Sequence, residues 1–509
     1  MKSSYSILPA PLLGTVGLIG LAILTSIAHA DSSDAGTSAS SPAAIDPPPT
    51  TILRSSPHVA PGLIFIAPIA VSSLAIPGGG TDAGSSGSPS TGQEGPEIID
   101  DFGRPVWFLP ITNGQSAADF RVQRFHGEPV ITWSQEQGLG GLAKGLTTDY
   151  ILDRHYRIVA TVTAGNGLDA DAHEFNITPE DTALITVYNA VTRDLTSVGG
   201  AANGLVIDGI VQEIDIASGR VLLEWHSLDH VSLEESHQPL PASPTAPYDY
   251  FHINAVSLDE DGNLLISSRH TWTVYKLDRH TGTIIWRLGG DNSDFTLGPN
   301  VPFAWQHNPI AVDRDTIRLF DNESSGTPVV PESRVIWIRR NVATKTATLL
   351  QSFVHPDRLS AGSQGGSQAL QNGDTFVGWG SVPRISEFDR NGNLIFDASL
   401  PAGYDTYRAY RFEWEGQPDT RPAAVVSVNG GITVVHAIWN GATDVARWDV
   451  VGNSGRERDI DESLLVGSSP WNGLDTAISI DGKPKAVRVV ARNRFGREIA
   501  SSPVTAIVE

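Results

Sequence analysis

The sequence contains no cysteine among its 509 residues. A disulfide framework, a cysteine-ligated metal and a cysteine nucleophile are therefore all excluded, and the fold must be stabilised by burial alone. Charged residues make up only 18% of the chain, and the excess of acidic over basic residues gives a formal net charge of −22. This charge disfavours a nucleic-acid partner and binding to an anionic membrane surface.

The residues that the chain has in abundance favour β-structure. It carries 50 glycines, 33 prolines and 12 tryptophans, which indicates many turns and an all-β plan rather than helices. Hydrophobic residues make up 40% of the chain, which is enough for globular folding. The chain is too long for one ordinary core, so we expect two or more domains or one large repeat array.

The N-terminus has the features of a secretory signal. Lys2 supplies a short positive region, the stretch LLGTVGLIGLAILTSIA is apolar, and the tripeptide AHA before Asp31 has the small-x-small pattern of a cleavage site. The apolar run is on the short side for an uncleaved membrane anchor. We therefore expect residues 1–30 to be a signal peptide and the mature protein to be secreted (extracellular or periplasmic), with no stable membrane span.

Two segments have compositions typical of chains that do not fold by themselves. Residues 31–54 begin with a Ser/Ala/Pro-rich stretch and are predicted to be a flexible linker. Residues 77–96 read PGGGTDAGSSGSPSTGQEGP and have almost no apolar side chains to bury. They are predicted to be a disordered surface insertion.

A loose repeat runs through the segment 55–421. Each repeat has an apolar strand, an acidic turn and a second apolar strand, followed by another hairpin with Asp and Gly in its turn. An inner hairpin followed by an outer one is the layout of a four-stranded propeller blade. The sequence predicts a β-propeller over 55–421, with six to eight blades and most simply six; a β-sandwich with insertions is the alternative. The inner hairpins are 173–189, 252–270, 306–323 and 366–381.

The pattern changes after the repeat. Residues 422–509 show short alternating strands at the size and spacing of an immunoglobulin-like or fibronectin-like β-sandwich. We therefore place a domain boundary near Pro422.

Polar side chains interrupt the strands of the second inner hairpin. Because strand residues alternate between faces, Tyr250, His252 and Asn254 are expected to share one face. Counting outward from the turn DEDG places His252 opposite Arg269, and Asn254 opposite Ser267. A five-residue turn would shift this pairing by one residue and break the arrangement.

The same counting applies to the other two hairpins that carry histidine. It places His307 opposite Asn322, and His173 opposite Thr186. If equivalent strands line a central funnel, three imidazoles and one guanidinium converge there. A tryptophan beside this set, Trp305, is a candidate for contact with an aromatic ligand or a sugar.

Such a cluster suits several kinds of chemistry. Arginine and histidine bind anionic groups such as sulfate, phosphate or carboxylate. A neutral imidazole is also a nucleophile towards sulfuryl or phosphoryl centres, and a general acid or base near neutral pH. Three histidines could instead bind Zn²⁺, but the permanent cation of Arg269 beside them opposes a metal. We therefore expect no metal and no cofactor.

Four motifs in order resemble one known family. The segments DADAHEFNITPEDTALITVY, DYFHINAVSLDEDGNLLISSRHTWTVYKLDRHTGTIIWRLGG, FAWQHNPIAV with IRLFDNES, and DTYRAYRFEWEG are similar to the arylsulfotransferase (ASST-type) family. The resemblance covers about residues 55–420 and is closest to a branch of secreted actinobacterial and fungal proteins. It implies a six-bladed propeller and sulfuryl transfer from a phenolic sulfate ester to a phenol, independent of PAPS, through a transiently sulfated histidine.

The resemblance also implies roles for individual residues. The nucleophile matches His307, in the motif WQHNP. Arg269, His252 and Asn254 would stabilise the negative oxygens of the transferring group, and His173 would protonate the leaving phenolate or deprotonate the acceptor. Tyr250, Asn322 and Trp305 complete the candidate set as substrate-binding residues.

Two other functions fit the same residues. A polysaccharide lyase would use Arg269 to neutralise a uronate carboxylate while a histidine abstracts the adjacent proton. A non-catalytic binding propeller would use the same patch only to hold an anion. The expected partners are therefore a phenolic sulfate and a phenol, or an anionic saccharide.

Overall fold

The computed structural model describes most of the chain beyond its N-terminal segment. The residues described are 45–71, 92–137, 147–325, 329, 332–429, 431–453, 464–481 and 484–507. They belong to one compact unit, Ile45–Glu509. The predicted signal peptide lies outside them, as do residues 31–44 of the linker and residues 77–91 of the insertion.

The predicted linker (31–54) and the predicted insertion (77–96) both end earlier in the structure than the sequence suggested. Thr51–Ser55, at the end of the predicted linker, forms strand β1. At the end of the predicted insertion, Glu94 forms a β-bridge with Ile111. Pairing with a partner strand therefore orders backbone that composition alone assigns to a loop.

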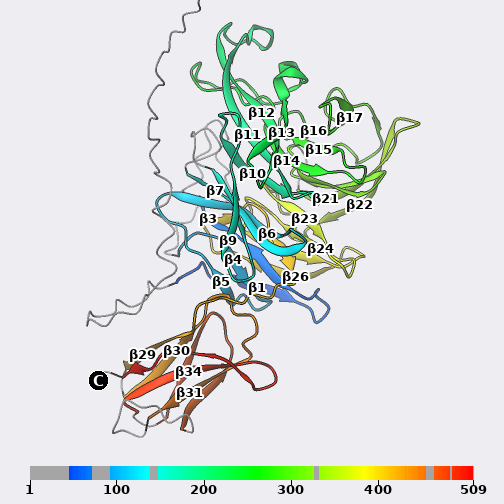
Figure 1. The fold of residues 1–509 in the computed structure, drawn as a ribbon. Helices are drawn as coiled ribbons and strands as arrows, with labels where there is room; N and C mark the ends of the chain where they lie inside the picture. Colours follow the sequence, from blue (N-terminus) through cyan, green and yellow to red (C-terminus); the bar gives the residue numbers. More distant parts are fainter. Residues whose placement is uncertain are drawn as a thin grey trace, which may run out of the picture. The chain divides into compact units, whose positions relative to one another are not determined.

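The all-β prediction is confirmed for the described residues. Figure 1 shows strands throughout the coloured parts of the chain. Helical structure among them is confined to single 3₁₀ turns, such as η2 (Thr196–Val198), η3 (Ser227–Asp229) and η4 (Leu233–Glu235). No helix in this part of the chain is long and apolar enough to cross a membrane.

The described residues between 51 and 412 form a series of sheets, and we number the larger ones I to VI. Most of their strands follow one another along the chain; the exceptions are the last strand, which joins sheet I, and β1, which joins sheet VI. Sheet I contains β28 (Tyr410–Phe412), β2 (Leu63–Ile66), β4 (Glu97–Ile99) and β5 (Pro105–Phe108). Sheet II contains β6 (Gln115–Phe125), β7 (Glu128–Gln137), β8 (Thr148–Leu152) and β9 (Ile158–Val162). Sheet III contains β10 (Ala170–Ile177), β11 (Thr182–Arg193), β12 (Gly204–Asp215) and β13 (Arg220–His226).

The remaining large sheets follow the same plan. Sheet IV contains β14 (Ile253–Leu258), β15 (Leu264–Ser268), β16 (Thr273–Leu277) and β17 (Ile284–Gly289). Sheet V contains β19 (His307–Asp313), β20 (Thr316–Asp321), β21 (Arg334–Asn341), β22 (Thr346–Val354) and β18 (Thr296–Leu297). Sheet VI contains β23 (Gly366–Ala369), β24 (Thr375–Gly378), β25 (Arg384–Phe388), β26 (Leu394–Ser399) and β1. A smaller sheet pairs β27 (Tyr404–Thr406) with β3 (Pro68–Ala70).

The first strand of each sheet contacts the first strand of the next. These contacts join β6 to β10, β10 to β14, β14 to β19, β19 to β23, β23 to β28, and β28 back to β6. The predicted inner hairpins are confirmed as β10–β11, β14–β15, β19–β20 and β23–β24. The start of each of these hairpins therefore lies beside the start of its neighbour.

The hydrophobic core is divided among the interfaces between successive sheets. Between sheets III and IV, Leu184 and Tyr188 pack with Phe251 and Tyr275. Comparable clusters lie between sheets IV and V, V and VI, VI and I, I and II, and II and III. The core therefore lies between sheets, and the first strands of the sheets are left to carry polar side chains.

Burial of both faces explains why many strands are apolar without alternation. In β2, Phe65 packs on sheet II, while Ile64 and Ile66 pack on sheet VI. In β15, Leu265 faces sheet V, and its neighbour Ile266 faces sheet III. A strand covered on both faces needs apolar residues at successive positions, which a half-exposed strand does not.

The C-terminal residues form two more sheets around one cluster. One sheet contains β29 (Ala423–Asn429), β30 (Ile432–Ile438) and β33 (Asp475–Ser479). The other contains β32 (Leu465–Pro470), β31 (Arg447–Gly452), β34 (Ala486–Arg492) and β35 (Glu498–Ser501), with β36 (Thr505–Ala506) paired to β34. Val435 and Ile478 of the first sheet share a hydrophobic cluster with Trp448 and Val489 of the second.

Candidate functional site

The candidate histidines come from the first strands of three successive sheets. His173 lies in β10, His252 immediately precedes β14, and His307 is the first residue of β19. Because these strands are neighbours, the three imidazoles are brought to one region. The rings of His173 and His252 meet edge to face, with their centroids 5.1 Å apart.

The structure explains how His252 reaches its predicted place opposite Arg269. The turn of its hairpin has five residues, so the strand pairing near the turn is shifted by one from the prediction. A bulge at Asn254 inserts one extra residue and restores the count. The backbone N–H of Arg269 therefore bonds the carbonyl of His252, at 3.0 Å. The predicted partner of Asn254 is wrong, because Ser267 pairs with Ala255.

Bulges also change the other two predicted pairings. His307 lies opposite Phe320 rather than Asn322. In β10 the register shifts between Asp171 and Phe175, so Thr186 lies opposite Asp171 rather than His173. A bulge turns a side chain relative to the strand's regular alternation, which strand counting cannot anticipate.

His173 is held by a carboxylate two residues before it. Its Nδ1 lies 2.9 Å and 2.7 Å from the two carboxylate oxygens of Asp171. Asp171 is buried and also accepts a hydrogen bond of 3.0 Å from the Thr186 hydroxyl. Burial opposes the charged form of His173, but the charge and hydrogen bond of Asp171 outweigh it and raise the pKa of His173. His173 is therefore the imidazole of this site best able to hold a proton.

His252 is held in a left-handed backbone conformation, with φ at 51°. Its backbone N–H donates to Oδ1 of Asp249 at 3.1 Å, and its Nδ1 lies 2.5 Å from Oδ2 of the same carboxylate. Burial, together with the positive charges of His173 and Arg269, lowers the pKa of His252 well below its ordinary value. His252 is therefore a neutral imidazole that donates its Nδ1–H to Asp249.

His307 is anchored by an amide instead of a carboxylate. Its Nδ1 lies 2.7 Å from Oδ1 of Asn322. The amide nitrogen of Asn322 donates to the carbonyls of Ala361 and Gln364 at 3.1 Å and 3.0 Å, which fixes Oδ1 as the acceptor facing His307. Nε2 therefore carries the lone pair of His307, and it accepts the backbone N–H of Gln364 at 3.2 Å.

The electrostatic surroundings keep His307 neutral. The residue is only 1% exposed, and this burial lowers its pKa well below the ordinary value, reinforced by the positive charge of Arg269. A neutral imidazole with its Nδ1–H fixed offers Nε2 as a nucleophile.

Arg269 is fixed by contacts on several sides. Its Nη1 donates to Nε2 of His270 at 2.9 Å, and its Nη2 donates to the Gly362 carbonyl at 2.9 Å and to the Ser325 hydroxyl at 3.3 Å. The guanidinium lies over the ring of Trp305, 5.1 Å from its centroid. Such a cation, oriented by stacking and hydrogen bonds, is suited to hold an anionic group.

The three remaining predicted residues differ in where they lie. Asn254 is buried and donates from its amide to the carbonyl of Gln306 at 2.8 Å, so it positions the residue just before His307. Trp305 belongs to the site through its contact with Arg269. Tyr250 does not reach the histidines in the contacts described; it lies in the core between sheets III and IV, and its hydroxyl bonds the Val231 carbonyl at 3.2 Å.

Strand counting missed the residues that hold the histidines from outside their own strands. Asp249 precedes β14 and contacts His252, while His270 follows β15 and contacts Arg269. Tyr407 contacts two of the imidazoles, with its ring centroid 5.7 Å from that of His173 and 6.4 Å from that of His307. The only available signal was proximity in sequence to the motifs DYFH, SSRH and DTYRAYRF.

A buried ion network lies next to His173. Arg408 donates to both carboxylate oxygens of Glu174, at 3.1 Å and 3.0 Å, and to Asp119 at 3.1 Å. Arg121 also bonds Glu174, at 2.8 Å. Arg408 further contacts the carbonyl of Asn254 at 3.3 Å. The network therefore ties sheets II and III to the bulge at Asn254, two residues after His252.

The structure gives little support to a metal bound by His173, His252 and His307. Among the described residues, one group with metal-ligand spacing includes a site histidine. It consists of Asp249, His252 and His270. In that group, Nδ1 of His270 donates to the Asp249 carbonyl at 2.5 Å, and Nε2 accepts from Arg269 at 2.9 Å. Neither nitrogen of His270 is therefore open to a metal unless a contact with Asp249 or Arg269 is displaced.

Comparison with known proteins gives one family match and distant structural similarity. The family model for arylsulfotransferase (ASST) matches residues 121–400. No curated protein matches the chain.

Similar solved structures include a protein of unknown function from Bacteroides caccae, at 12% identity over 69% of this chain and 98% of that chain, with a TM-score of 0.39. Streptogramin B lyase is similar at 11% identity over 74% of this chain and 94% of that chain, with a TM-score of 0.31. The GH43 protein BlXynB from Bacillus licheniformis is similar at 10% identity over 76% and 89%, with a TM-score of 0.30. These scores are too low to carry an argument about this chain.

The family match has a direct bearing on the site. It spans more than half of the chain and contains β10, β14, β15 and β19, the strands that position His173, His252, Arg269 and His307. The motifs singled out in the sequence lie largely within the matched residues. The chain therefore belongs to the arylsulfotransferase (ASST) family.

Proposed function

We propose that this protein is an aryl sulfotransferase that moves a sulfuryl group from a phenolic sulfate ester to a phenol, independently of PAPS and of any cofactor, through a sulfated His307. The observation that carries the proposal is the difference among the three anchored imidazoles. Asp171 and Asp249 hold His173 and His252, whereas a neutral amide, Asn322, holds His307. Carboxylate partners suit proton transfer, and an amide partner suits a nucleophile.

The amide partner has a specific chemical consequence. When Nε2 of His307 attacks sulfur, the ring keeps its Nδ1–H because an amide oxygen is too weakly basic to remove it. The sulfated ring is then positively charged, and a positively charged imidazole leaves sulfur more readily than a neutral one. Asn322 therefore favours an intermediate that can react onward.

In the first half-reaction, a bond forms between Nε2 of His307 and sulfur while the bond from sulfur to the aryl oxygen breaks. The aryl oxygen takes a proton from His173, whose protonated form is favoured by the charge and hydrogen bond of Asp171. The guanidinium of Arg269 and the backbone N–H of Gln364, released from Nε2, offer hydrogen bonds to the sulfuryl oxygens. Proximity and charge stabilisation dominate such a transfer, as they do in phosphoryl transfer.

In the second half-reaction, the acceptor oxygen attacks the same sulfur. The bond between sulfur and Nε2 breaks, and its electron pair returns to His307. The proton of the acceptor passes to an imidazole of the site, which restores the starting charge. No nucleotide donor is needed, because the aryl sulfate supplies the sulfuryl group.

We further propose that sheets I to VI are the six blades of a propeller, with the site where their first strands meet. The cyclic series of strand contacts and the hydrophobic cluster at each interface support this architecture. The pair of sheets in residues 423–506 is proposed to be an immunoglobulin-like or fibronectin-like sandwich. The signal-like N-terminus supports the proposal that the mature protein is secreted.

The decisive experiment is to trap the covalent intermediate. We expect the protein incubated with an aryl sulfate and no acceptor to release one equivalent of phenol and to gain the mass of one sulfuryl group. Peptide mapping by mass spectrometry should place that group on His307, and adding a phenol should remove it. Absence of both phenol release and labelling would exclude this function, whereas unsaturated products from a uronate polymer would indicate a lyase.

The first half-reaction should depend on pH through His173. Because the pKa of His173 is raised, its acid form persists above the pH at which an ordinary histidine loses its proton. The acid form is lost only as the pH rises through this raised pKa. Phenol release should therefore fall on the alkaline side. Asp171→Asn removes the charge that raises this pKa, so the fall should begin at lower pH, and release at neutral pH should slow by about 10-fold to 100-fold.

Donors with different leaving groups provide the control for this prediction. A strongly acidic phenol needs little protonation as it leaves, so Asp171→Asn should affect it least. An alkaline limb unchanged in Asp171→Asn for a weakly acidic leaving phenol would rule out His173 as the acid.

A further inference from the structure

The hydrogen bonds of His173 fix one corner of its ring but not the plane of the ring. Within the described residues Nδ1 is the ring atom that bonds, and both of its contacts, at 2.9 Å and 2.7 Å, are to Asp171. The side chain is 19% exposed, and Nε2 is the ring nitrogen left for a substrate. Rotation about the line from Nδ1 to Asp171 would move Nε2 while keeping this contact. Another contact must therefore set the direction of Nε2.

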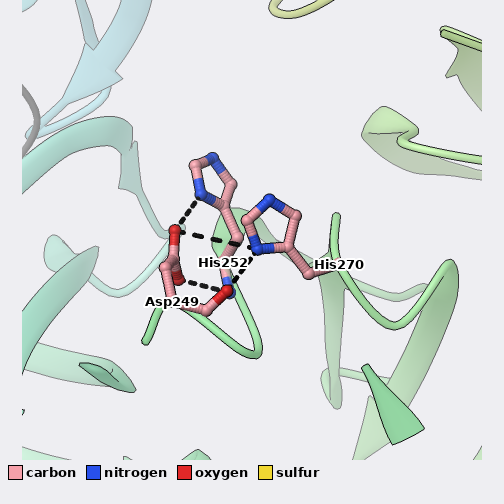
Figure 2. Close-up of side chains that lie close together, drawn as sticks. All are labelled: Asp249, His252 and His270. Atoms are coloured by element: carbon pink, nitrogen blue, oxygen red, sulfur yellow. Dashed lines mark hydrogen bonds and ion pairs between the residues drawn. The ribbon is translucent and has the colours of Figure 1, made fainter. Parts of the chain in front are cut away.

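The ring of Tyr188 supplies such a contact. It lies flat against the ring of His173, with centroids 5.3 Å apart and planes 16° apart. The rings of His252 and Tyr407 meet His173 nearly at right angles, with centroids 5.1 Å and 5.7 Å away. His252 is itself held by Asp249, as Figure 2 shows. One flat contact and two edge contacts therefore restrict the plane of the His173 ring.

Tyr188 is in turn fixed by the close approach of sheets III and IV. It lies in β11 opposite Gly209 of β12. A Cβ atom at Gly209 would come within 2.9 Å of Phe251 and 3.2 Å of Ile253, so a glycine here lets sheet III approach these two residues. The hydroxyl of Tyr188 donates to the carbonyl of Ile253 at 2.9 Å. The tyrosine is 7% exposed, and its ring is therefore held on both the strand side and the hydroxyl side.

The stack also favours the protonated form of His173, because the π electrons of an aromatic ring attract a cation that lies over its face. The charge and hydrogen bond of Asp171 act in the same direction. The titratable groups that face His173 are Asp171 on β10, Glu136 on β7, Tyr188 on β11, Asp249 and His252 before β14, His307 on β19, and Tyr407 after β27. Among these, Tyr188 is the group that lies flat against the imidazole.

We propose that Tyr188 is a positioning residue that sets the plane of the His173 ring, and with it the direction of Nε2, for proton transfer to and from the phenol. This inference rests on the proposed sulfotransferase function, in which His173 is the acid. Departure of the donor phenol and attack by the acceptor phenol are one displacement at the same sulfur run in opposite directions, so His173 serves both.

The proton follows the bonds at sulfur in each direction. It passes from Nε2 of His173 to the leaving phenol as the bond from sulfur to oxygen breaks and the bond from sulfur to His307 forms. It returns to His173 from the acceptor as sulfur bonds to the new oxygen and the bond to His307 breaks. Tyr188 forms no bond in either step and acts only through His173.

Two variants of Tyr188 test this role. Tyr188→Leu removes the flat ring, whereas Tyr188→Phe keeps the ring and removes only the hydroxyl. In Tyr188→Leu, release of a phenol from the donor and transfer from the sulfated enzyme to the same phenol should both slow, by the same factor of about 10-fold to 100-fold. The KM for the donor should change by less than about 3-fold, because Arg269 keeps its contacts. In Tyr188→Phe both rates should stay within about 3-fold of wild type.

The pKa of His173 provides a readout that does not depend on turnover. Selective ¹⁵N labelling of histidine allows its titration by NMR in the whole protein, with the His173 signal assigned by its loss in His173→Gln. This pKa should fall by about half a pH unit in Tyr188→Leu and keep its wild-type value in Tyr188→Phe.

Three results would overturn the assignment: unchanged rates in Tyr188→Leu, equal slowing in both variants, or slowing in Tyr188→Leu with an unchanged pKa of His173. The last two would show that the tyrosine supports the fold without setting the imidazole. Failure of the proposed function would instead appear as wild-type protein that never gains a sulfuryl group, whatever the titration of His173 shows.

Discussion

His307→Asn is expected to reduce turnover of an aryl sulfate by roughly 10⁴-fold or more, because the variant lacks the atom that forms the covalent bond to sulfur. The protein should also gain no sulfuryl mass when it is incubated with donor alone. Arg269 remains in place in this variant, held by His270 and Gly362. Binding of the aryl sulfate, measured by its protection of the protein against thermal unfolding, should therefore persist while chemistry is lost.

Two further variants make this result specific. Asn322→Ala keeps the nucleophile but removes the acceptor for Nδ1–H, so we expect a smaller loss of about 10-fold to 100-fold, with labelling slowed but not abolished. His280→Asn alters an exposed histidine in the turn between β16 and β17 and should leave turnover unchanged. Labelling of His307→Asn at another histidine, with turnover retained, would show that the nucleophile is assigned to the wrong residue.

The sequence was informative about the hairpins because their signals are local. Acidic turns with Gly, such as the one that contains Gly262 with φ at 80°, mark where a strand reverses. Apolar residues at successive positions, such as Leu265 and Ile266, mark strands that are covered on both faces. These two side chains pack against different neighbouring sheets. Histidine at the same point of three hairpins identified the region of the site, since equivalent positions in a repeat become neighbours in space.

Side-chain direction could not be obtained in the same way. The predicted pairing of His252 with Arg269 holds only because a five-residue turn and a bulge at Asn254 cancel each other. No such cancellation occurs for His307, yet it still reaches Asn322 through its side chain. Bulges depend on packing against neighbouring sheets, which is information that a single hairpin sequence does not contain.

Partners from distant parts of the chain were equally out of reach. Asp249 lies outside the strand whose histidine it holds, and Tyr407 comes from a segment 100 residues beyond His307. Arg408 reaches Asp119 across 289 positions of the sequence. Only the order of the sheets brings these residues together, so the histidines and Asn322 could be named from local sequence, whereas Asp249, Tyr407 and Arg408 could not.

Arg408→Met is expected to lower the free energy of unfolding by about 3–5 kcal/mol, because it leaves two buried carboxylates, Asp119 and Glu174, with the single cation of Arg121 between them. Arg408 is 1% exposed, and it bonds Asp119, Glu174 and the carbonyl of Asn254. Methionine fills part of the volume but supplies no donor. Urea unfolding followed by tryptophan fluorescence measures the change, and turnover should fall as well, since the contact with Asn254 holds the bulge beside His252.

The double variant Arg408→Met with Glu174→Gln distinguishes loss of charge balance from loss of packing. Arg121 and Asp119 would remain as an ion pair, with nitrogen and oxygen 2.9 Å apart, and no carboxylate would be left without a cation. Stability should therefore recover in part relative to Arg408→Met alone. Arg157→Met, which breaks an exposed ion pair with Asp419, should change stability little, because solvent screens such pairs. If the double variant were no more stable than Arg408→Met, packing would outweigh charge in this network, and the buried ions would act mainly to orient the strands that carry the site.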